Sequence, residues 1–158
     1  MFLVTKARVL GMAAAIFVAG AGFAVAQDKE TVLKEREATM KEQAKNIGAV
    51  KAYLDGKGDV AQAKTGAANL TQTTKKIPQL FPAGTGGPSP DGDYVAKPEI
   101  WTDWNKFLDA QKTAAAKADA LLVAVNGSDK NAIEAAFNDL GKNGCGGCHT
   151  TFREKISK

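Results

Sequence analysis

Apolar side chains recur at steps of three and four residues in four stretches of the chain, and this period predicts amphipathic helices. The first stretch covers residues 28–54, where lysine and glutamate fill the positions between the apolar ones. The others cover residues 60–77, 98–126 and 128–156. Four such helices, joined by two short turns and one longer loop, predict an all-α protein folded as an antiparallel four-helix bundle.

Turn and capping residues separate these stretches. Gly56 and Gly58 end the first helix, and Asp59 is the expected N-cap of the second. Ser128 or Asp129 is the expected N-cap of the fourth helix. The apolar face of the second helix is small, so we expect it to pack closely against a neighbour; its members are Ala63, Ala67, Leu70, Thr74 and Ile77.

Residues 82–98 are rich in Gly, Pro, Ser and Asp, which predicts a long crossing loop between the second and third helices. Pro78 ends the second helix, and Pro98 suits the first position of the third. We interpret the loop as a spacer between helices. No stretch of the chain competes as a β-strand.

The first 26 residues have the pattern of a secretory signal peptide. Lys6 and Arg8 form a basic start, residues 9–25 are apolar, and Ala24-Val25-Ala26 has the A-x-A form of a cleavage site. A membrane anchor is the alternative, because the apolar run is nearly long enough to span a bilayer. The many small residues and the cleavage signal favour removal, export to a bacterial periplasm, and a mature domain of residues 27–158 without a membrane contact.

The net charge of the mature chain is close to zero and indicates no particular class of partner. The 158 residues include 21 basic and 17 acidic side chains. Loss of Lys6 and Arg8 with the signal peptide leaves 19 basic against 17 acidic residues, a net charge of +2. We therefore expect no nucleic-acid partner.

One motif carries specific chemistry. Cys145-Gly146-Gly147-Cys148-His149 reads C-x-x-C-H, the attachment signal for c-type haem. In that chemistry two thiols form thioether bonds to one porphyrin, and the histidine is an axial ligand of its iron. On a helix, Cys145, Cys148, His149 and Phe152 lie at i, i+3, i+4 and i+7 and share one face. We expect one covalent haem c, attached at Cys145 and Cys148, with His149 on the iron and Phe152 in the wall of the site.

Other uses of two thiols explain less. A thioredoxin-like redox pair expects a βαβ pattern, and none surrounds the motif. A zinc site usually has four protein ligands, whereas the chain has two cysteines and one histidine in all. A plain disulfide of an exported protein is a further alternative, but it leaves the adjacent His149 unexplained.

A helix bundle with this motif late in its last helix resembles the class II c-type cytochromes, the cytochrome c prime group. The resemblance rests on the sequence from Cys145 to Arg153, on Lys97-Pro98-Glu99-Ile100-Trp101, and on the turn from Ile77 to Pro82. It implies that Arg36 pairs with a haem propionate and that Trp101 borders the haem. The family has a high-spin branch, which binds small gases at five-coordinate iron, and a low-spin branch, in which a methionine is the sixth ligand and the protein carries electrons.

Met40 decides between these branches. It stands four residues after Arg36, at the family's distal position, and it is the one methionine left after the signal peptide is removed. A methionine on a helix stripe is more often core filler. Antiparallel packing would nevertheless place Met40 and His149 at similar levels. We therefore predict a periplasmic electron carrier with iron ligated by His149 and Met40; the alternative is a five-coordinate cytochrome c prime that binds nitric oxide or carbon monoxide.

Further expectations concern partners. Lys142, Arg153, Lys155 and Lys158 form either a solvated helix face or a basic rim that docks redox partner proteins. The small-residue face of the second helix permits a homodimer. No general acid–base constellation is visible, so we expect no enzymatic turnover.

The mass of the exported protein tests the haem prediction. After export from a host with haem-attachment machinery, mass spectrometry of the denatured protein should give the mature polypeptide plus one haem. A mass equal to the polypeptide alone would favour a haem-free thiol or metal protein.

Overall fold

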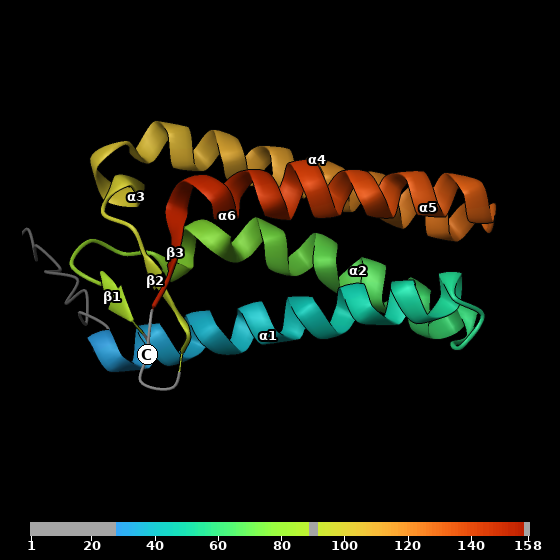
Figure 1. Cartoon of the computed structure of the whole chain (residues 1–158), viewed down its shortest axis with the longest axis horizontal. Coiled ribbons are helices and arrows are strands. Elements are labelled where there is room, and N and C mark those ends of the chain that lie inside the picture. The colour runs from blue at the N-terminus through green and yellow to red at the C-terminus, as the bar shows by residue number, and fades with distance from the viewer. Residues whose placement is uncertain (1–27, 89–91, 157–158) are drawn as a thin grey trace, which may run out of the picture.

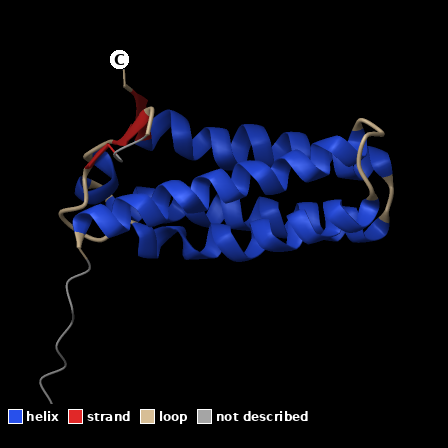
Figure 2. Ribbon diagram, turned by 90° about the horizontal axis from the view of Figure 1, so that it is seen from below, coloured by secondary structure: helices blue, strands red, loops and turns tan. Residues whose placement is uncertain are grey.

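The computed structural model describes residues 28–88 and 92–156, and these form an antiparallel four-helix bundle (Figures 1 and 2). Three helices of the bundle are continuous: α1 (Lys29–Leu54), α2 (Val60–Lys76) and α4 (Trp104–Gly127). The fourth consists of three consecutive parts: α5 (Lys130–Asp139), the π-helix η2 (Leu140–Gly146) and α6 (Gly147–Phe152). α1 packs against α2, α2 against α4, α4 against this fourth helix, and α5 against α1. The predicted fold class is confirmed.

The predicted signal peptide, residues 1–26, lies outside the described residues. Within residues 28–88 and 92–156, no helix combines the length and the apolar character needed to cross a membrane.

Aspartates begin the four main helices. Asp28, Asp59, Asp103 and Asp129 each accept a hydrogen bond from a backbone N–H in the first turn that follows. Such a cap stabilises a helix by about 1 kcal/mol. The cap predicted at Asp59 is confirmed, and the fourth helix uses Asp129, because Ser128 takes a left-handed conformation (φ 62°) that ends α4.

The third predicted helix is broken. The pattern predicts one helix over residues 98–126, but the structure has a short α3 (Glu99–Thr102) before α4. Asp103 lies outside the helical region at φ −130° and ψ 59°, and its carboxylate accepts a hydrogen bond from the backbone N–H of Lys106 at 3.3 Å. The separate α3 buries Ile100, which is 1% exposed.

The expectation of no β-strand is wrong. Three short strands, β1 (Gly87–Pro88), β2 (Tyr94–Ala96) and β3 (Arg153–Lys155), form an antiparallel sheet in the order β1-β2-β3. The last predicted helix ends at Phe152, because Arg153 turns to an extended conformation and pairs with Ala96. The crossing loop is therefore more than a spacer, since it pairs with the C-terminal segment.

The apolar core has two parts along the bundle. The body cluster lies toward the end with the short turns and consists of Val50, Ala63, Ala67, Leu70, Ala118, Leu121, Val125, Ile133 and Leu140. The end cluster lies where α3 and the strands gather (Figure 1, left) and consists of Ile77, Leu80, Phe81, Ile100, Phe107 and Phe152.

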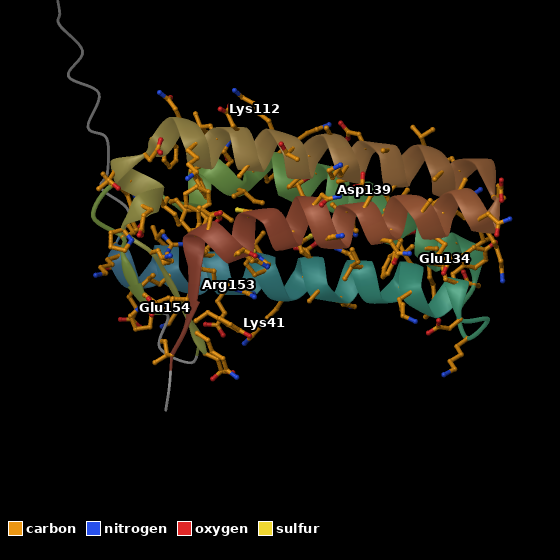
Figure 3. The ribbon with its side chains drawn as sticks, turned by 45° about the horizontal axis from the view of Figure 1, so that its top comes forward. Lys41, Lys112, Glu134, Asp139, Arg153 and Glu154 are labelled. Carbon is orange, nitrogen blue, oxygen red and sulfur yellow. The ribbon has the colours of Figure 1, made fainter. Side chains whose placement is uncertain are left out.

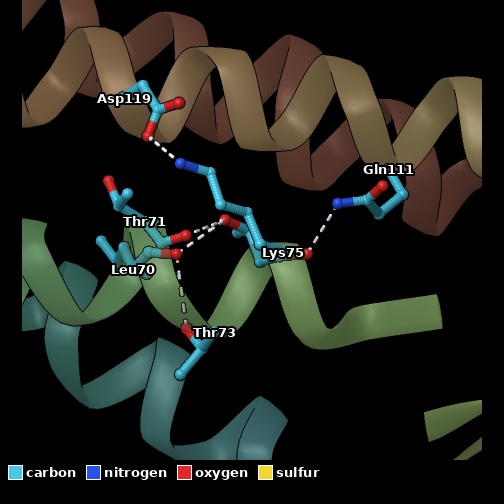
Figure 4. A network of polar contacts seen from close by, with 7 residues as sticks. Leu70, Thr71, Thr73, Lys75, Gln111 and Asp119 are labelled. Atoms are coloured by element: carbon cyan, nitrogen blue, oxygen red, sulfur yellow. Dashed lines mark hydrogen bonds and ion pairs between the residues drawn. The ribbon is translucent and has the colours of Figure 1, made fainter. Parts of the chain in front are cut away.

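α2 joins its two neighbours in different ways. Toward α1 it packs at backbone distance: a Cβ built on Gly66 would lie 2.7 Å from the carbonyl oxygen of Asn46. Toward α4 it uses polar contacts (Figure 4), in which Lys75 Nζ pairs with Asp119 at 3.0 Å and Gln111 donates to the α2 backbone. The five residues predicted for the apolar face of the second helix are all buried, four of them in α2 and Ile77 in the 3₁₀ helix η1 (Ile77–Leu80) that follows it.

Gly66→Ala tests the close packing of α1 and α2. The added methyl must push α1 away, and overpacking of this kind costs about 1–3 kcal/mol of unfolding free energy. The matched control is Gly48→Ala, because a Cβ at Gly48 on the exposed face of α1 meets nothing within 4 Å. The control should gain about 0.5–1 kcal/mol from helix propensity. Equal effects in urea unfolding would contradict the packing.

Candidate haem site

A pocket opens beside the end cluster, and α1 and α6, which Figure 1 draws as separate ribbons, both contribute to its lining. We call it the end pocket. Its empty space, counted together with the part that is open to solvent, is about 800 Å³. Its wall is mostly apolar and includes five members of the end cluster: Ile77, Phe81, Ile100, Phe107 and Phe152.

The four residues predicted to share a helix face all line this pocket: Cys145, Cys148, His149 and Phe152. Their helix is not uniform, because Cys145 lies in η2 and the others lie in α6. Single π-helical turns within a helix are frequent at functional sites. Both cysteines are free thiols, so the structure does not contain the disulfide considered above.

Gly144 brings η2 close to α4. A Cβ at this position would lie 2.9 Å from Leu140 Cδ1 and 3.4 Å from Ala114 Cα. A glycine inside a helix costs about 1 kcal/mol relative to alanine. Here that cost permits the close approach that places Cys145 against the pocket.

The end pocket disfavours charge on the motif. Burial, aided by the nearby Arg153, lowers the pKa of His149 to about 4. Burial raises the pKa of Cys148 to about 11 and also raises that of Cys145. At neutral pH the imidazole and both thiols are therefore uncharged, and a neutral imidazole is the form that binds a metal ion.

Arg36 is buried and already holds several partners. Its Nε donates to the Leu80 carbonyl oxygen at 3.0 Å, while Nη1 and Nη2 donate to the carbonyl oxygen and hydroxyl of Thr85 at 3.1 and 2.8 Å. The guanidinium also stacks on Phe81, 4.0 Å from the ring centroid. Burial lowers the pKa of Arg36 to about 10, so it stays protonated at neutral pH. These bonds occupy three of its five N–H groups, and Arg36 lines the end pocket.

Met40 and Gln43 extend this face of α1 and also line the pocket. Met40 packs against the end cluster as a partly buried apolar side chain. Gln43 was not among the predicted site residues, although a polar residue seven positions after Arg36 on the same helix face is a visible signal.

Trp101 lies outside the lining of the end pocket but packs against the end cluster, and its place beside the haem stays a prediction. Its indole N–H donates to the carbonyl oxygens of Phe81 and Pro82 at 3.0 and 3.1 Å. Phe81 does line the pocket, so Trp101 supports a wall residue from behind.

The small sheet supplies a further wall that sequence reasoning missed. All of β2 (Tyr94–Ala96) lines the end pocket, and the Arg153 guanidinium stacks 4.0 Å from the centroid of the Tyr94 ring. A neighbouring hollow, lined in part by Lys41, shares Arg36 and Arg153 with the end pocket; Figure 3 shows Arg153 where α6 meets β3. We call this hollow the mouth of the pocket.

Of the basic residues expected to form either a solvated helix face or a rim, one lies at the pocket. Arg153 lines it, whereas Lys142 and Lys155 are exposed and lie outside the lining. Lys158 lies outside the described residues.

These residues fit a c-type haem. Two thiols and a neutral imidazole lie on one wall, and the rest of the wall is mostly apolar, as a flat apolar ring requires. At the mouth, the cations Arg36, Lys41 and Arg153 lie beside Glu37 and Asp93, so the cationic groups that would meet the two haem carboxylates are present. A zinc site fits less well, since the described residues contain no cluster of three or more His, Cys, Asp or Glu able to hold a metal ion.

Comparison with known proteins agrees with this fit. Residues 31–153 match the family described as Cytochrome C'. The chain is 36% identical over 146 residues to a cytochrome c' of Rhodopseudomonas palustris, covering 91% of this chain and 94% of the relative. It is 37% identical over 100 residues to a cytochrome c-554 of Cereibacter sphaeroides, covering 61% of this chain and 71% of the relative. A solved nitric oxide complex of a variant cytochrome c prime from Alcaligenes xylosoxidans superposes with a TM-score of 0.70 at 29% identity, covering 82% of this chain and 98% of that one.

The predicted low-spin electron carrier with Met40 as sixth ligand is therefore wrong. The family match and the Rhodopseudomonas palustris relative carry the name cytochrome c', and the Alcaligenes structure is a complex with a gas. They agree with the alternative, the high-spin branch. The chain belongs to the cytochrome c' family, which binds one covalent haem c with its iron.

Proposed function

We propose that this protein binds a small neutral gas, nitric oxide or carbon monoxide, at a five-coordinate haem iron held by His149 in the end pocket. The observation that carries the proposal is the asymmetry of the pocket. One wall offers the chain's single imidazole, while the α1 wall offers Met40, a side chain packed into the end cluster. The nitric oxide complex of the Alcaligenes relative supports the same chemistry.

The site residues divide the work of holding the haem. Cys145 and Cys148 attach it by thioether bonds, and the neutral His149 ligates the iron. Phe152 packs at the wall, and the remaining N–H groups of Arg36 face a propionate at the mouth. A haem held by these residues would supply an iron able to bind a neutral gas.

The apolar wall favours neutral diatomic ligands over anions and water. A charged ligand would lose its hydration in this pocket, and the cation on the α1 wall, Arg36, already donates to Leu80 and Thr85. Met40 excludes water there while remaining flexible enough to move aside for a diatomic molecule. We infer that the protein acts by binding rather than by turnover of a substrate.

We propose a bacterial periplasm as the compartment, on the basis of the signal-peptide pattern in residues 1–26 and the covalent haem. The homodimer stays a prediction. The α2 residues expected to permit it are buried within the subunit, so a dimer through α1 and α2 would use their outer surface.

Met40→Leu tests the proposal directly. Leucine keeps the apolar volume but removes the sulfur, and such swaps usually cost less than about 1.5 kcal/mol. If Met40 only lines the pocket, the visible spectra of wild type and variant should both be high-spin. Both reduced proteins should also bind carbon monoxide at once.

The opposite result is easily recognised. A wild-type protein that is low-spin and resists carbon monoxide, together with a high-spin Met40→Leu, would contradict the proposal. Met40→Ala is a further comparison, because its larger pocket should bind carbon monoxide at least as readily as the leucine variant does.

Thr85→Val tests the Arg36 anchor. The variant leaves Nη2 of a buried guanidinium without its acceptor, so the free energy of unfolding should fall by about 1–3 kcal/mol. The control is Thr113→Val, because that hydroxyl makes an exposed bond to the Asp109 carbonyl within α4 and should matter by about 0.5 kcal/mol or less. Equal losses in denaturant unfolding would rule out the anchor.

A further inference from the structure

One amide in the end pocket has no partner in the protein. Gln43 lies three residues after Met40 on α1, and both side chains line the pocket. The Nε2 atom of Gln43 is buried and has no hydrogen-bond acceptor among the described residues. A buried N–H donor without an acceptor destabilises the folded state, so the fold alone does not account for Gln43.

Two other amides show what is particular to Gln43. Gln111 also lines the end pocket, but its Nε2 donates to the Thr74 carbonyl oxygen at 2.9 Å. Asn46 also has a buried Nδ2 without a partner, but it lies outside the lining of the end pocket. Among the described residues, Gln43 therefore combines an unpartnered amide donor with a side chain that lines the pocket.

The position of Gln43 indicates what its donor meets. His149 lines the pocket from α6, whereas Gln43 and Met40 line it from α1; Figure 1 draws these two helices as separate ribbons, α6 above and α1 below. A ligand that enters opposite the imidazole therefore comes to the α1 wall. Arg36, on the same wall, directs three of its N–H groups to Leu80 and Thr85, and we assigned the other two to a propionate, so Gln43 supplies a separate, neutral donor close to Met40.

We propose that Gln43 donates a hydrogen bond from Nε2 to the outer atom of the diatomic ligand on the α1 side of the end pocket. This inference rests on the proposed gas-binding function and assigns the residue that tunes it. The bond favours ligands whose outer atom carries more negative charge, and it slows their escape. Gln43 is thus a specificity-determining residue in an otherwise apolar wall.

Carbon monoxide bound to the reduced holoprotein is the probe, and Gln43→Leu is the test variant. A net hydrogen bond corresponds to a factor of about 2–10 in an equilibrium constant, so carbon monoxide should leave the variant about 2–10 times faster. The C–O stretching band in the infrared spectrum should move to higher frequency, since a donor to the outer oxygen lowers it. Gln43→Met, which is unbranched like glutamine, should give the same shift and so separates loss of the donor from a change of shape.

Two controls separate this role from a structural one. Asn46→Ala removes an unpartnered amide outside the pocket and should leave both the dissociation rate and the C–O band unchanged. The thermal midpoint of ligand-free Gln43→Leu should equal or exceed that of wild type, because an apolar group replaces an unsatisfied one.

The outcomes are distinct. Unchanged dissociation and an unchanged C–O band in both Gln43 variants, or equal changes in Asn46→Ala, would overturn the role of Gln43 and leave gas binding intact. A wild-type protein that binds no carbon monoxide would overturn the proposed function and this inference together.

Discussion

The functional end of the molecule depends on the hydrogen bonds that the buried guanidinium of Arg36 donates. The guanidinium ties α1 to the segment after α2 through Leu80 and Thr85, with Phe81 stacked against it. A buried cation is stable only when its donors are satisfied, so these bonds determine where the crossing segment lies. Phe81 then becomes a pocket wall, and Trp101 holds its backbone from behind. Arg36, which the resemblance implies as the partner of a haem propionate, thus also anchors segments within the protein.

The environment of the end pocket explains how a few polar groups acquire specific roles. Desolvation keeps His149 neutral and the thiols protonated, which suits ligation and attachment to an apolar ring. The same desolvation strengthens any hydrogen bond from the remaining donors, because a hydrogen bond is stronger where water is excluded. This is why Gln43 stands out against Gln111, whose amide is already satisfied by the α2 backbone.

The error over Met40 has a physical origin. Helix periodicity places Met40 on the inner face of α1, and the structure confirms that position. Periodicity does not determine whether a sulfur atom reaches an iron or fills a gap between aromatic side chains, because both need an inward-facing methionine. The sequence therefore predicted correctly that Met40 lies in the pocket wall, but predicted wrongly that it ligates the iron. Comparison with the cytochrome c' relatives corrected this role.

The sequence by itself determined the parts that depend on local spacing. The helix pattern, the caps at Asp59 and Asp129, the buried face of α2 and the shared face of Cys145, Cys148, His149 and Phe152 all follow from interactions within a few residues. Only the tertiary structure decided the break at Asp103, the pairing of β2 with β3, and the partners of Arg36 and Trp101. These features join segments distant in sequence or depend on how such segments pack. Strands of two or three residues carry too short a pattern to be seen alone, and a buried donor finds its acceptor only when the chain has folded around it.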